Sequence, residues 1–129
     1  MRIFLAAAAL LLFAEPVLAE GDLYAAIAYS QASKAVGIAK DKNSKEDAEQ
    51  AASTSCGAAS CKTISVRNGC AVLAVASDGA WAINGGDDQP DANQRAIAAC
   101  TKYAKSSCRV RATATMPPAS CRTRPRRST

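Results

Sequence analysis

The segment from Ser44 to Cys56 reads SKEDAEQAASTSC and the segment from Asp88 to Cys100 reads DQPDANQRAIAAC, so one pattern occurs twice, 44 residues apart. Each copy begins with a residue that favours a helix N-cap, carries an aspartate three residues later and ends in a cysteine. Alanines at 48, 51 and 52 give the first copy a small-residue face, and Pro90 suits a first helical turn. The pattern predicts two capped helices that end at corresponding cysteines.

Short strand-like segments flank both predicted helices in the same order. The first copy contains the predicted strands 24–29, 35–39 and 62–67, and the second contains 70–76, 80–83 and 108–114. The turn signal Asn68-Gly69 separates the two copies. A unit with one apolar face must cover that face, so we predict an α+β fold of two pseudo-repeated strand-strand-helix-strand units packed together.

Residues 1–19 have the three parts of a secretory signal peptide. Arg2 gives a positive start, residues 3–13 are apolar, and Val17-Leu18-Ala19 places small residues before a cleavage site. The apolar run is about half of the roughly 20 residues that span a bilayer, which argues against an uncleaved anchor. We expect cleavage before Glu20, a mature chain of 110 residues without a transmembrane segment, and a secreted or periplasmic location.

Six cysteines lie beyond this leader, and an oxidising compartment favours their pairing. Spacing and the repeat favour Cys56 with Cys61 and Cys100 with Cys108, which leaves Cys70 with Cys121 by elimination, although six cysteines allow 15 connectivities. A zinc site is the alternative, but the chain has no histidine and lacks CxxC spacing. We predict a small disulfide-stapled domain over 20–115 and a Pro/Arg-rich tail, 116–129, held at Cys121.

The ordered set of motifs resembles a bacterial secreted family known as domain of unknown function 4189 (DUF4189), over about residues 23–115. The motifs are 24–30, 46–52 running to Cys56, Asn68-Gly69-Cys70-Ala71 and Ala98-Ala99-Cys100. The resemblance implies an exported α+β domain of duplicated build, found in proteobacteria and mycobacteria, without an established activity or catalytic residues. Where members often carry aromatic-glycine pairs in the second strand of each half, this chain has Val36-Gly37-Ile38 and Trp81-Ala82-Ile83.

Catalytic constellations are missing from the sequence. Without histidine, the usual general base of serine or cysteine hydrolases is absent. Asp87, Asp88 and Asp91 form the densest acidic group, but they stand where a helix begins, and capping favours negative charge there. Gly85-Gly86 lacks the sequel of a phosphate-binding loop and is interpreted as a plain loop. We predict no catalytic, metal-binding or cofactor-binding residue and no enzymatic activity; lysine or carboxylate chemistry of an unrecognised type is the alternative.

Positive charge collects at the end of the chain. Beyond the leader, Lys and Arg outnumber Asp and Glu by 15 to 10. Arg122, Arg124, Arg126 and Arg127 all follow the last cysteine, and we expect a disordered basic tail there. Its simplest role is solubility; its sharper role is attraction to an anionic envelope partner. Aromatic residues interleaved with basic ones are missing, so nucleic acid is not an expected partner.

The few aromatic residues are candidates either for the core or for an exposed binding surface. Trp81 fits a core anchor better than a binding aromatic, because few other large side chains can fill the interior. Tyr24 and Tyr29 are an odd number of residues apart and should face opposite sides of one strand, so we expect one of them to be exposed.

These features predict a non-enzymatic exported domain that acts by binding an unknown host or envelope protein. An inhibitor of a secreted or envelope hydrolase is one form of this function, with the cysteine-closed loops 57–60 and 101–107 as the segments that would enter the target. A structural envelope component that relies on the basic tail is another alternative.

Overall fold

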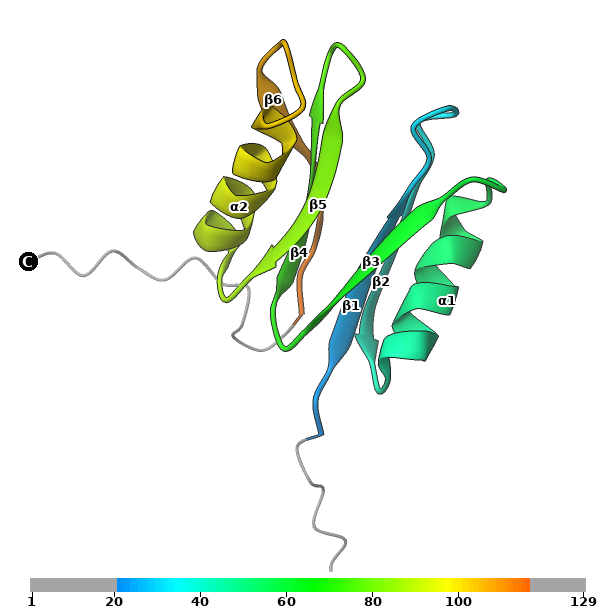
Figure 1. Cartoon of the computed structure of the whole chain (residues 1–129). Coiled ribbons are helices and arrows are strands. Elements are labelled where there is room, and N and C mark those ends of the chain that lie inside the picture. The colour runs from blue at the N-terminus through cyan, green and yellow to red at the C-terminus, as the bar shows by residue number, and fades with distance from the viewer. Residues whose placement is uncertain (1–20, 117–129) are drawn as a thin grey trace, which may run out of the picture.

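The computed structural model describes residues 21–116, and this part of the chain forms two similar units (Figure 1). The first unit contains β1 (Tyr24–Tyr29), β2 (Val36–Lys42), α1 (Lys45–Cys56) and β3 (Lys62–Arg67). The second contains β4 (Cys70–Ala76), β5 (Trp81–Gly86), α2 (Gln89–Thr101) and β6 (Cys108–Ala114). The predicted α+β fold of two strand-strand-helix-strand units is confirmed.

Each unit is an antiparallel three-stranded sheet with its first strand in the middle. The strand orders are β2-β1-β3 and β5-β4-β6, so β1 corresponds to β4, β2 to β5 and β3 to β6. Each helix covers one face of its own sheet, and the opposite faces of the two sheets pack on each other. The two helices therefore lie on the outer sides of the molecule (Figure 1).

Both helices begin at the predicted caps. The Ser44 hydroxyl accepts a hydrogen bond from the backbone N–H of Asp47 at 3.1 Å, and the Asp88 carboxylate accepts one from that of Asp91 at 2.9 Å. These bonds satisfy N–H groups that have no partner within the helix. At the other end of α1, Gly57 has a φ of 69°, a left-handed conformation that costs glycine little.

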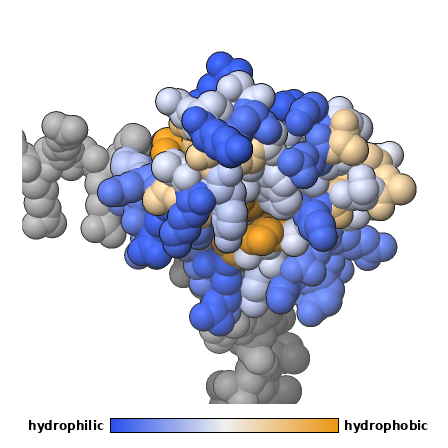
Figure 2. All heavy atoms as spheres, turned by 45° about the horizontal axis from the view of Figure 1, so that its top comes forward, coloured by the Kyte–Doolittle hydropathy of each residue, from blue (hydrophilic) through white to orange (hydrophobic). Residues whose placement is uncertain are grey.

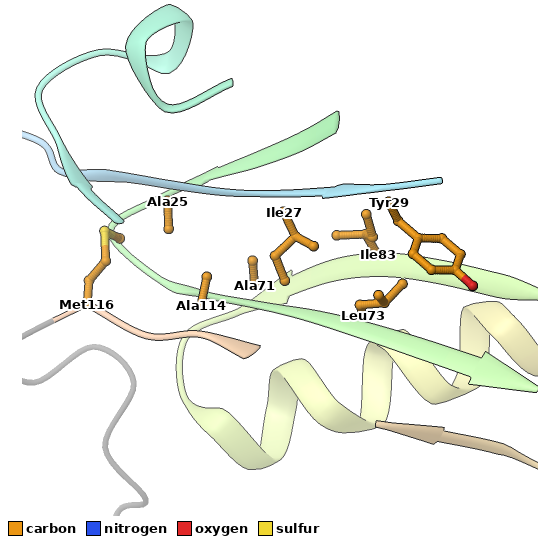
Figure 3. Packing of buried hydrophobic residues seen from close by; sticks show 8 residues of the cluster. All are labelled: Ala25, Ile27, Tyr29, Ala71, Leu73, Ile83, Ala114 and Met116. Atoms are coloured by element: carbon orange, nitrogen blue, oxygen red, sulfur yellow. The ribbon is translucent and has the colours of Figure 1, made fainter. Parts of the chain in front are cut away.

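The large apolar side chains meet between the two sheets. Ala25, Ile27 and Tyr29 of β1 point toward Ala71 and Leu73 of β4 (Figure 3). Ile83, Ala114 and Met116 complete this buried cluster. Alternation along the two central strands explains the arrangement, because every second residue of β1 and β4 faces the opposite sheet.

Alanine fills the two layers between sheet and helix. The intervening positions of β1 are Ala26 and Ala28, which pack on Ala48 and Ala52 of α1. The corresponding layer in the second unit joins Val72 and Ala74 to Ala92 and Ala96. Small side chains let each helix lie close to its sheet, so both central strands are buried on both faces.

Disulfides join the last turn of each helix to the start of the third strand of its unit: Cys61 immediately precedes β3, and Cys108 is the first residue of β6. Cys56 pairs with Cys61 and Cys100 with Cys108, as predicted. The two bonds have matching surroundings: Cys56 Sγ lies 3.5 Å from the Ala35 carbonyl oxygen, and Cys100 Sγ lies 3.7 Å from that of Ala80. Such bonds indicate an oxidising compartment. Cys70 is disulfide-bonded too; its predicted partner, Cys121, lies outside the described residues.

Several boundaries differ from the prediction. The second strand runs to Lys42 instead of residue 39, and Gly85-Gly86, expected as a loop, ends β5 because these glycines pair with Ala71 and Cys70. Met116, expected in the tail, is 4% exposed in the inter-sheet core.

No helix within 21–116 is long and apolar enough to cross a membrane. The expected leader, residues 1–19, lies outside the described part.

Candidate functional site

Four chain connections lie together at one end of the molecule. Tyr29, at the end of β1, pairs with the first residues of β2 and β3, and Val75, near the end of β4, pairs with Trp81 and Arg109. Each sheet therefore places one turn and one disulfide-closed loop at this end. We call this surface the rim; it consists of residues 30–35, 57–60, 77–80 and 101–107.

Hydrogen bonds join these four segments into one band. The Ser30 and Ser60 hydroxyls are 3.2 Å apart, which ties the first turn to the first loop. Gln31 Nε2 donates to the carbonyl oxygen of Gly79 at 2.7 Å and so connects the two units. Asp78 fastens the second turn to the second loop, because its carboxylate accepts from the backbone N–H of Lys105 and its own N–H donates to the Ser106 hydroxyl.

Asp78 is held in its ionised form by these contacts. The backbone N–H of Lys105, followed by that of Ala80, lowers the pKa of the Asp78 carboxyl below its usual value. A carboxylate that already accepts several backbone hydrogen bonds is poorly suited to proton transfer. We interpret Asp78 as a positioning group for the rim.

Tyr103 is the most exposed large apolar residue of the described chain. Its relative exposure is 78%, whereas Ile64 and Ile38 follow at 42% and 41%. Beside it lies an open hollow of about 470 Å³, lined by Gln31, Asp78, Gly79, Ala80 and Lys105. Figure 2 brings this end forward and shows hydrophilic residues with small hydrophobic areas between them. An amphipathic phenol beside a hollow is a typical anchor in a protein interface.

A second depression lies between the edge strands β3 and β5. This β3–β5 groove has a volume of about 560 Å³ and is lined by residues 64–67, by 83–87 and by Asp91 and Arg95 of α2. At its floor the two sheets touch, because a Cβ on Gly85 would lie 2.4 Å from Cγ1 of Val66. Ile64 borders the groove with an exposed side chain.

Charged side chains at the groove are paired with each other. Arg95 Nε donates to both carboxylate oxygens of Asp91, at 3.0 and 3.1 Å. This hydrogen bonding is the main cause that lowers the pKa of the Asp91 carboxyl. Nη1 of Arg67 lies 3.6 Å from Oδ2 of Asp22, so these two side chains form an ion pair. The groove therefore combines an apolar floor with a polar border.

The structure places the candidate residues as follows. Asp88 caps α2, as predicted, and within residues 21–116 no three His, Cys, Asp or Glu side chains are grouped to hold a metal ion.

Trp81 packs on the core and contacts Tyr29 edge to face, with ring centroids 5.4 Å apart. The expectation that Tyr24 or Tyr29 is exposed is wrong, since Tyr29 is buried and Tyr24 packs beside α1. The four tail arginines lie outside the described residues.

Both loops of the rim were predicted from the sequence, but Tyr103, Gln31 and Asp78 were not among the predicted site residues. Tyr103 could have been found, because it is the only aromatic residue in the two short segments, 57–60 and 101–107, that paired cysteines were predicted to close. Gln31 and Asp78 could not have been found from the sequence, because their hydrogen-bond partners are 48 and 27 residues away in the chain.

Comparison with known protein families gives a match. Residues 24–115 match the model of a family described as a domain of unknown function, DUF4189. No curated protein and no solved structure matches the chain.

Proposed function

The chain belongs to the DUF4189 family, and on the basis of its geometry we propose that it is an exported, non-enzymatic domain that binds a protein partner through the rim. The observation that carries this proposal is the exposure of the Tyr103 side chain. Tyr103 is 78% exposed and lies on a loop closed by the Cys100–Cys108 disulfide. An exposed aromatic side chain on a constrained loop loses little conformational entropy on binding. The disulfides also support a secreted or periplasmic location.

The rigidity of the rim favours insertion into a concave partner. Loop 101–107 is held at both ends by one disulfide and in its middle by Asp78, which binds the backbone at Lys105. Constrained loops of this kind suit the cleft of an enzyme, so a secreted or envelope hydrolase is the partner class that the geometry favours within this proposal. Lys105 and Tyr103 would present a cation and a phenol side by side.

A photocrosslinking experiment tests the proposal. The exported protein would carry p-benzoylphenylalanine in place of Tyr103 or, as the control, in place of Gln94, which is exposed on α2. We expect a crosslinked protein at position 103 and none at position 94. Tyr103→Ala should then weaken binding of the purified partner at least tenfold, as loss of an interface anchor does, whereas Gln94→Ala should not. Equal crosslinking at both positions, or unchanged affinity of Tyr103→Ala, would refute the proposal.

A further inference from the structure

Positive charge collects at the rim end of the molecule. Six cationic side chains belong to the rim or to the parts of β3 and β6 beside it, and all six are exposed. These rim cations are Lys34, Lys62, Lys102, Lys105, Arg109 and Arg111. The rim segments, β3 and β6 together contain one acidic residue, Asp78. The rim end therefore has a marked excess of positive charge.

The acidic residues gather at the opposite end, where the helices begin. Lys42, shortly before α1, pairs with Tyr24, the first residue of β1, whereas the rim lies beyond the last residue of that strand. Segments 41–49 and 87–91, together with Asp22, contain every described acidic residue except Asp78. Within residues 21–116, the ion pairs involve none of the rim cations; they are Lys45–Glu49, Arg67–Asp22 and Arg95–Asp91.

Asp78 does not supply the missing counter-charge as an ion-pair partner. Its carboxylate accepts from the backbone N–H groups of Lys105 and Ala80, and within 21–116 it forms no ion pair with a Lys or Arg side chain. The bond to Lys105 fixes the backbone of loop 101–107. The base of the Lys105 side chain is therefore held in place while its ammonium group stays in solvent.

We propose that the rim recognises an acidic protein surface, with Lys102 and Lys105 on either side of Tyr103 as its principal charge contacts. This inference rests on the proposed function and specifies its partner: a hydrolase whose cleft is lined by carboxylates. Enzymes that act through paired Asp or Glu side chains, as most glycoside hydrolases do, have such clefts. A lysine ammonium would pair with a cleft carboxylate while the Tyr103 ring fills the space beside it.

Complementary charge would also speed the encounter. Exposed cations without internal partners create a positive potential that attracts an acidic protein from a distance and raises the association rate. Because all the rim cations are exposed, this attraction is screened by salt. Salt dependence is therefore a direct readout of the proposal.

The test is a titration of the mature protein, residues 20–129, with a peptide of six glutamates, followed by backbone amide chemical shifts. We expect shift changes at Lys34, Tyr103 and Lys105, and none at Lys40 and Lys42 at the opposite end. Raising NaCl from about 0.02 M to about 0.3 M should weaken the binding. Shift changes spread evenly over both ends, or no changes at the rim, would overturn the proposal.

Two paired substitutions make the result specific. Lys102→Gln with Lys105→Gln should raise the dissociation constant of the peptide about three- to tenfold, as expected for two exposed charge pairs. Lys40→Gln with Lys42→Gln removes the same charge from the opposite end and should change it less than about twofold. The tail arginines are present in both variants, so they do not affect the comparison. Equal effects of the two pairs would contradict a role of the rim cations.

A nucleic acid provides the comparison with another polyanion. A thymidine oligonucleotide with six phosphates should bind no more tightly than the peptide, because Tyr103 is the only exposed aromatic side chain within 21–116 and bases gain affinity by stacking. Binding more than about tenfold tighter would assign the rim to nucleic acid and overturn the proposal.

The photocrosslinking experiment separates this inference from the proposed function. With p-benzoylphenylalanine at position 103, the added substitutions Lys102→Gln and Lys105→Gln should lower the yield of the crosslinked partner, and Lys40→Gln with Lys42→Gln should not. A crosslink whose yield is the same in both variants would refute the acidic partner and leave the rim as a binding surface. Absence of any crosslink at position 103 would refute the proposed function, whatever the peptide does.

Discussion

Gly37 of β2 lies directly against Ala52 of α1: a Cβ built on Gly37 would come within 2.0 Å of the Ala52 carbonyl oxygen and 2.3 Å of the Cys56 backbone nitrogen. Backbone atoms of a helix cannot move aside as a flexible side chain does. The contact sets the distance between α1 and its sheet at the last turn of the helix, next to the Cys56–Cys61 disulfide.

Replacement of Gly37 should therefore be strongly destabilising. We expect Gly37→Ala to lower the free energy of unfolding by about 2–4 kcal/mol, because α1 must shift to admit the methyl group. The corresponding position of the second unit already holds Ala82, so Ala82→Gly serves as the matched control, with an expected cost of about 1 kcal/mol. Urea denaturation followed by circular dichroism measures both, and equal effects of the two substitutions would contradict this account.

Loss of either loop disulfide should also lower the free energy of unfolding. The bonds close segments separated by 5 and 8 residues, for which chain entropy gives about 2–3 kcal/mol each. We expect paired substitution of Cys56 and Cys61 by serine, or of Cys100 and Cys108, to lower stability by this amount in urea denaturation. The second pair should also impair binding of the partner, since it holds Tyr103. Full partner affinity without the Cys100–Cys108 bond would argue against a rigid loop as the binding element.

Local patterns predict most of this fold because they agree with its long-range packing. The polar-apolar alternation of β3 and β6, the caps at Ser44 and Asp88 and the two short cysteine spacings each point to the observed structure. Gly85-Gly86 shows where local reasoning fails. A glycine pair favours a turn, but pairing with β4 and the close approach of Val66 keep this segment in the sheet.

The candidate sites are less accessible to sequence reasoning than the fold is. The rim depends on which ends of the two sheets meet, and the bond from Gln31 to Gly79 exists only after the units pack. The groove likewise arises from two edge strands of different units. Because neither feature has a local signature, the sequence predicted the loops of the rim without showing that they form one surface.

Acid should loosen the rim through Asp78. The folded-state pKa of Asp78 lies below the unfolded value of 3.8, so its contribution to stability is present above that pH and is lost as the pH falls through the folded pKa. We expect hydrogen exchange at the Lys105 amide, measured relative to intrinsic rates, to lose protection below about pH 3.8 in the native protein. Asp78→Asn should lack this step, and Asp41→Asn provides the control for removal of one carboxylate. Unchanged protection down to pH 2 would contradict the assigned role.

Removal of Arg111 should open the edge of the molecule at which β6 lies beside β2. Its guanidinium donates to the carbonyl oxygen of Lys34 and contacts the Tyr29 ring, whereas Arg109 on the same strand makes no contact of this kind with the described residues. We expect Arg111→Ala to cost about 1 kcal/mol, the sum of an exposed hydrogen bond and a cation–π contact, and Arg109→Ala to stay within about 0.5 kcal/mol. Arg111→Lys should recover only part of the loss, because an ammonium lacks the planar fork. The backbone amide chemical shifts of Tyr29 and Trp81 should change in the Arg111→Ala variant and stay the same in the Arg109→Ala variant. Similar changes in both variants would show that Arg111 does not fill this edge specifically.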